Sequence, residues 1–176
     1  MNGGDQVEPD PSAGAIAHPR PTTQGSSQER SPEGIATVLA GVAALAGVML
    51  LATLPLALVL VQVDGRTVAS YGTDAGHDVA LALLGLALLG AAFAALRGGD
   101  AVAWGAVAVI GVTTLAVTGL FDLPDVRADG AFGPRLVAAE SVPGAAFYLE
   151  SLGGTLALLS GGFALLLGLG DERGRR

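Results

Sequence analysis

From residue 35 onward, long uncharged stretches alternate with short polar ones. A helix rises 1.5 Å per residue, so about 20 apolar residues cross the hydrocarbon core of a bilayer. Four segments meet this requirement: residues 35–62, 79–96, 101–120 and 147–169. The pattern predicts an all-α membrane protein, a four-transmembrane-helix bundle, with residues 35–170 as its membrane domain.

The first of these segments is longer than a bilayer requires. Residues 35–62 carry no charge and contain Pro55. Proline removes a backbone donor and bends a helix, so we expect one long helix that is kinked at Pro55. Its excess length is expected to be absorbed by tilt, by this kink or by an extension into the lipid headgroups.

Helix-ending residues separate the second and third segments. Asp78 precedes residues 79–96 and is expected to cap that helix, while Asp100 is expected to cap the helix over 101–120. Between them, Arg97-Gly98-Gly99-Asp100 is short enough to predict a tight reversal. The two helices are therefore expected to be antiparallel neighbours.

The polar ends of the chain are predicted to be cytoplasmic. Residues 1–34 are rich in Pro, Gly and Ser and predict a disordered tail, and residues 171–176 form a short charged tail. Four spans place both tails on one side, and arginines near span ends favour the cytoplasm. Six arginines lie on the tail side and three on the other: Arg20, Arg30, Arg97, Arg173, Arg175 and Arg176 against Arg66, Arg127 and Arg135. The predicted localisation is the plasma membrane, multi-pass.

Composition supports lipid as the solvent. Hydrophobic residues make up 51% of the chain and charged residues 14%, against about 25% charged residues in soluble domains. The net charge of −7 argues against a nucleic-acid partner. With no cysteine, the chain has neither disulfides nor thiol chemistry.

Small residues on the fourth segment predict close helix packing. Gly153, Ala157 and Gly161 recur every four residues and make one smooth face. In lipid, helices associate through such faces because burial of apolar surface gives no gain. We expect this face to pack within the chain, in a homo-oligomer or with a partner membrane protein.

Aromatic residues are expected to fix the depth of the bundle in the membrane. Phe121, Phe147 and Tyr148 fall at the predicted outer interface, and Trp104 lies near the inner one. Aromatic side chains favour both interfaces.

Three acids are candidate functional residues: Asp122, Asp125 and Glu150. The first two lie in the stretch FDLPDVRADGAFGP, residues 121–134, where Pro124 predicts a turn after the third helix. Glu150 is the sharpest candidate, because acids within spans are rare and often functional. We expect it among lipid headgroups, paired with Arg127 or Arg135, and a proton relay is its alternative role.

A second polar group combines His77 and Asp78 with Asp74. Such residue types can bind a metal ion, but capping by Asp78 is the favoured interpretation because structural zinc needs four ligands. No catalytic, cofactor-binding or metal-binding residue is predicted. The pattern shows no enzyme motif, no histidine–carboxylate pair on facing spans and no buried charge.

The predicted function is that of a non-enzymatic integral membrane protein, a structural or accessory subunit that packs with itself or with a partner. The alternative is a small transport or channel component formed by oligomerisation. Its polar lining would come from Thr113, Thr114 and Thr118. A membrane enzyme that uses Asp122 and Asp125 is a third possibility.

Overall fold

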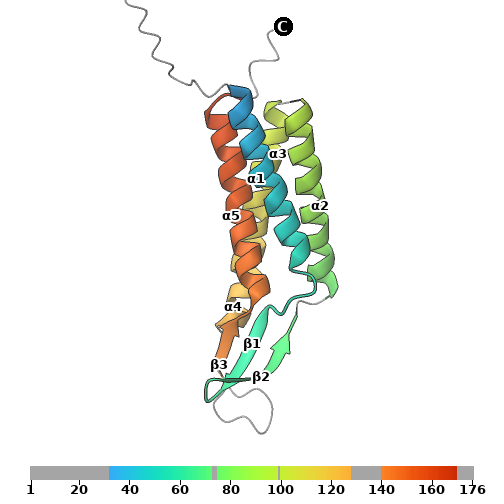
Figure 1. Ribbon diagram of the computed structural model, residues 1–176. Coiled ribbons are helices and arrows are strands. Elements are labelled where there is room, and N and C mark those ends of the chain that lie inside the picture. Colours follow the sequence, from blue (N-terminus) through green and yellow to red (C-terminus); the bar gives the residue numbers. More distant parts are fainter. Residues whose placement is uncertain (1–31, 73–74, 99, 128–139, 170–176) are drawn as a thin grey trace, which may run out of the picture.

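The computed structural model describes residues 32–72, 75–98, 100–127 and 140–169, and it is mostly helical (Figure 1). The long helices are α1 (Pro32–Ala52), α2 (Ala75–Arg97), α3 (Ala101–Val117) and α5 (Ala145–Leu166). A π turn, η1 (Thr118–Asp122), and a short helix, α4 (Leu123–Val126), continue α3. Within the described residues, four helical segments are long and apolar enough to cross a membrane, the third running from Ala101 to Val126.

The four long helices form a closed ring. α1 contacts α2 and α5, and α3 contacts the same two helices from the other side (Figure 1). α2 and α3 are antiparallel neighbours, as their short connection predicts, and Asp100 caps α3 by accepting a hydrogen bond of 2.7 Å from the Ala103 amide. α1 begins and α5 ends at the same end of the bundle, and a small sheet extends from the opposite end (Figure 1). We call these the helix-terminal end and the sheet end.

The expected kinked helix over residues 35–62 is wrong beyond Ala52. The 21 residues of α1 already span about 32 Å, enough to cross the hydrocarbon core. Pro55 cannot continue the helix, and the Thr53 hydroxyl donates a hydrogen bond of 2.7 Å to the Leu50 carbonyl at its end. Pro55 therefore terminates the helix instead of bending it.

Part of the first apolar segment forms the centre of a three-stranded antiparallel sheet. β1 (Val59–Val63) pairs with β2 (Arg66–Tyr71) on one side and with β3 (Glu140–Pro143) on the other. The turn between β1 and β2 places both Asp64 and Gly65 at positive φ, the geometry of a tight hairpin turn. The sheet joins the α1–α2 connection to the α4–α5 connection and so ties the two halves of the bundle together.

The third helix also departs from its predicted end at Leu120. It continues as η1, where the Leu123 amide bonds to the Thr118 carbonyl, and then as α4 with Pro124 in the first turn. A π turn uses hydrogen bonds one residue longer than an α-helix, which accommodates the missing proline donor. The expected turn at Pro124 is therefore wrong, and helical structure extends to Val126.

Small residues fill the interior of the ring. Gly161 lies against the backbone of Trp104 and Ala108 on α3, while Gly47 and Gly85 face each other between α1 and α2. Trp104, expected at the interface, is fully buried beside alanines of three other helices. Its predicted anchoring role is wrong, because small neighbours leave a space that only a large side chain fills.

The predicted tails fall almost entirely outside the described residues. Residues 32–34, assigned to the disordered tail, instead begin α1 with Pro32 as its first residue. Proline suits this position because the first amide of a helix has no intrahelical partner. Residues 171–176 lie outside the part that the structure describes.

Candidate functional site

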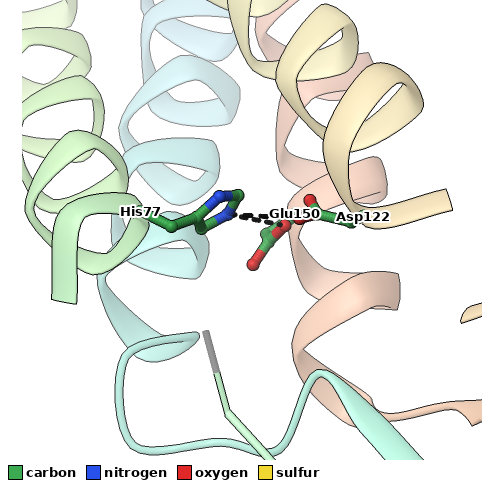
Figure 2. A group of neighbouring side chains, drawn as sticks. All are labelled: His77, Asp122 and Glu150. Atoms are coloured by element: carbon green, nitrogen blue, oxygen red, sulfur yellow. Dashed lines mark ion pairs between the residues drawn. The ribbon is translucent and has the colours of Figure 1, made fainter. Parts of the chain in front are cut away.

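Three ionisable side chains from three helices meet inside the bundle near its sheet end (Figure 2). His77 lies in the first turn of α2, Asp122 is the last residue of η1, and Glu150 lies in the second turn of α5. We call these three residues the acid–histidine cluster. Figure 2 shows the imidazole pointing toward both carboxylates.

Local structure places each member of the cluster. The hairpin of β1 and β2 precedes α2 in the chain, so His77, in the first turn of α2, lies near the sheet end of the bundle. Buried residues on the third helix recur four apart at Thr114, Thr118 and Asp122. The wider π turn keeps this spacing on one face and so turns Asp122 inward.

The cluster is held close together and away from solvent. The Nε2 atom of His77 lies 3.5 Å from Oδ1 of Asp122 and 3.8 Å from Oε2 of Glu150. The exposed fractions of the side chains are 13% for His77, 4% for Asp122 and 0% for Glu150. Both distances exceed those of good hydrogen bonds, so the three side chains are close neighbours with room between their polar atoms.

Several oxygens of the cluster lack hydrogen-bond partners. Among the described residues, neither carboxylate oxygen of Glu150 has one, and the same holds for Oδ2 of Asp122. Buried polar atoms in proteins are nearly always satisfied, and leaving a charged group unsatisfied costs several kcal/mol. Such oxygens are available to a ligand that supplies a proton or a positive charge.

Acidic groups outnumber basic ones around the cluster. Asp78, next to His77 on α2, acts electrostatically on Glu150 and has a buried oxygen without a hydrogen bond in the described part of the chain. It lies inside the first turn of α2, which begins at Ala75, so the predicted cap before the helix is wrong. The local field favours a positively charged ligand.

The predicted environment of Glu150 is also wrong. Glu150 is fully buried, and the ion pair recorded for it across the described residues goes to His77. Arg127 is exposed, and Arg135 lies outside the described residues. The expectations of no buried charge and no histidine–carboxylate pair on facing helices both fail at this cluster.

The other candidate acids separate in the structure. Asp122 is buried in the cluster, whereas Asp125, one turn later on α4, is exposed. Asp74, expected near His77, lies outside the described residues. The sequence thus predicts two of the three cluster residues, Asp122 and Glu150, as candidate functional acids. It groups His77 with Asp74 and Asp78 instead.

The three packing residues of the fourth segment are all buried: Gly153, Ala157 and Gly161. Gly153 faces Ala46 and Leu50 of α1, and Gly161 faces α3. The face therefore packs within the chain, and it sets the rotation of α5 that turns Glu150 inward.

The donor atoms of the cluster are arranged as metal ligands are. One nitrogen of His77 and one oxygen from each carboxylate all lie within 4.8 Å of one another. Comparison of the chain with protein-family models, with curated proteins and with solved structures finds no match.

Proposed function

We propose that this protein is a non-enzymatic, multi-pass protein of the plasma membrane that serves as a structural or accessory subunit. The supporting observation is the outer surface of the bundle, where every long helix exposes large apolar side chains. They include Val38, Leu45 and Val48 on α1, Leu83, Leu86 and Phe93 on α2, Val102 and Val109 on α3, and Leu152, Leu159 and Phe163 on α5. Large apolar residues on the outside and many Ala and Gly residues at the helix contacts inside suit a bundle surrounded by lipid.

Aromatic residues support the same placement. Phe121 and Tyr148 are both largely exposed near the sheet end, and Tyr148 makes an edge-to-face contact with Phe147. Exposed aromatic side chains at one level of a bundle favour the membrane–water interface. Together with the arginine bias of the sequence, this supports an orientation with the sheet outside and both termini in the cytoplasm.

Labelling of introduced cysteines tests the placement, because the chain has none of its own. Two exposed positions mark the two ends: Thr67 on β2 and Glu33 in the first turn of α1. In intact cells, we expect a membrane-impermeant maleimide to label Thr67→Cys and to reach Glu33→Cys only after permeabilisation. The reverse pattern would refute the orientation, and recovery of the protein in the soluble fraction would refute the membrane assignment.

The interior of the bundle supports a non-conducting role for a single chain. Two apolar clusters fill much of the ring: one contains Leu50 and Leu88, and the other, toward the helix-terminal end, contains Trp104. The hydroxyls of Thr114 and Thr118 donate to carbonyls of their own helix, one turn earlier. Threonines bonded in this way offer little to a passing ion.

The alternative, a channel component formed by oligomerisation, draws on one observation. Thr113 is exposed on the outer face of α3, where a second copy could bring threonines together. Its hydroxyl also donates to the carbonyl four residues earlier, as that of exposed Thr155 does on α5. An ion path would then lie between chains.

A flux measurement separates the two functions. We expect sealed liposomes that contain the protein to pass protons and K⁺ no faster than protein-free liposomes, because the two apolar clusters leave no continuous polar path through the described part of the bundle. The measurement uses a pH-sensitive dye with and without a K⁺ gradient. Protein-dependent flux that is lost in Thr113→Val but kept in the matched Thr155→Val would establish the channel instead.

The accessory role requires a complex in the native membrane. The protein is expected to migrate on native gels, after mild detergent extraction, as an assembly larger than one chain. Cross-linking should be photochemical, since the chain has neither lysine nor cysteine. Migration as a monomer would refute the accessory role.

A further inference from the structure

We propose that His77, Asp122 and Glu150 bind a divalent transition-metal ion of the zinc type inside the bundle. Three donor atoms from three helices converge on one point, and the two carboxylates are almost completely buried. The second observation is Oε2 of Glu150, which has no hydrogen-bond partner in the described part of the chain and lies on the side of the carboxylate that faces the imidazole (Figure 2). The inference stands independently of the accessory role.

The distances suit a tetrahedral ion. Bonds of about 2.0–2.2 Å to nitrogen and oxygen place tetrahedral ligand atoms about 3.3–3.6 Å apart. The nitrogen of His77 lies 3.5 and 3.8 Å from the two carboxylate oxygens, close to this spacing, and all three donor atoms lie within 4.8 Å of one another. Octahedral Mg²⁺ would require neighbouring ligands about 3.0 Å apart and prefers water and carboxylates.

The donor set selects the class of metal. Imidazole suits zinc and its transition-metal neighbours, whereas Ca²⁺ and Mg²⁺ prefer oxygen ligands. Three protein ligands leave a fourth position for water or an external ligand. We therefore expect Zn²⁺ to bind much more tightly than Ca²⁺.

Charge balance explains why two acids can be buried together. Two ionised carboxylates and a neutral imidazole carry two negative charges, and a divalent ion cancels both. An unpaired charge in the apolar interior is costly, whereas a neutral metal cluster is not. The bound ion would also cross-link α2, the third helix and α5 next to the sheet.

A direct binding measurement tests the proposal on the full-length chain. The protein is purified without a histidine tag, reconstituted in nanodiscs, stripped with chelator and titrated with Zn²⁺ by calorimetry. We expect one equivalent to bind saturably. Titration with Co²⁺ should give the visible absorption bands of a tetrahedral site, and this readout needs no variant. Absence of saturable binding would refute the proposal, as would a Co²⁺ spectrum identical to that of the hydrated ion.

Variants locate the bound metal. We expect His77→Ala and Glu150→Gln each to weaken the affinity for Zn²⁺ at least about tenfold. Matched controls are His18→Ala, which removes the other histidine of the chain, and Asp125→Asn, which removes an exposed acid one turn from Asp122; both should bind as the wild type does. Unchanged affinity in both cluster variants would place the ion elsewhere and overturn the assignment.

Discussion

Gly161→Ala is expected to destabilise the bundle by about 1–3 kcal/mol or more. A Cβ atom at position 161 would lie 2.5 Å from the Ala108 amide nitrogen and 2.8 Å from the Trp104 carbonyl oxygen. Both are backbone atoms, which cannot rotate away as a side chain can, so α5 and α3 must separate. Unfolding in mixed micelles with increasing sodium dodecyl sulfate measures the loss as a lower midpoint.

The neighbouring glycine supplies a matched control. A Cβ atom at Gly162 would meet nothing within 4 Å, and alanine favours helix over glycine by up to about 1 kcal/mol. Gly162→Ala should therefore be neutral or slightly stabilising. Equal midpoints for the wild type and Gly161→Ala would show that the close α3–α5 contact does not stabilise the fold.

Gly144→Ala is expected to disrupt the junction between the sheet and the bundle. Gly144 precedes α5 and donates a hydrogen bond of 2.7 Å from its amide to the Leu58 carbonyl. An added Cβ atom would overlap the Ala57 carbonyl oxygen and lie 2.9 Å from the Leu58 carbonyl carbon. We expect a loss of at least about 1–3 kcal/mol and faster hydrogen exchange of the β1 and β3 amides.

Gly72 is the matched glycine at the other strand-to-helix junction. It follows β2 and precedes α2, and an added Cβ atom there would lie 4.0 Å from the nearest atom, the Leu56 carbonyl oxygen. Gly72→Ala should leave both stability and hydrogen exchange close to those of the wild type. If Gly144→Ala behaved in the same way, the close approach of β1 to the start of α5 would not hold the sheet in place.

The sequence contains a signal for the hairpin of β1 and β2, but the hydrophobicity of the first strand obscures it. VLVQV and RTVASY are rich in β-branched residues and flank Asp64-Gly65, a strong two-residue hairpin signal. VLVQV nevertheless continues an uncharged run, so its composition matches a membrane helix equally well. As a strand, this segment makes its backbone hydrogen bonds only by pairing with β2 and β3. The second of these partners, β3, lies far along the chain.

The burial of Trp104 could not be predicted from the sequence for a different reason. Its position near a helix end favours an interfacial anchor, as for Phe121 and Tyr148, which are indeed exposed. Whether an aromatic residue faces lipid or the core depends on the rotation of its helix. That rotation is set by the glycine contacts between α3 and α5, which a single sequence does not show.

The sequence by itself determined the four long apolar helices, the short α2–α3 reversal with its Asp100 cap, and the small-residue face of α5. These features follow from local composition and from spacing along one helix. Tertiary structure alone decided that α1 stops at Ala52, that a sheet joins the two connections, and that His77, Asp122 and Glu150 meet. Each of those outcomes depends on contacts between residues that are distant in sequence. A hydropathy profile evaluates one segment at a time and does not include such contacts. The three ionisable groups converge only if each helix is rotated correctly about its own axis. Close backbone packing between the helices fixes that rotation.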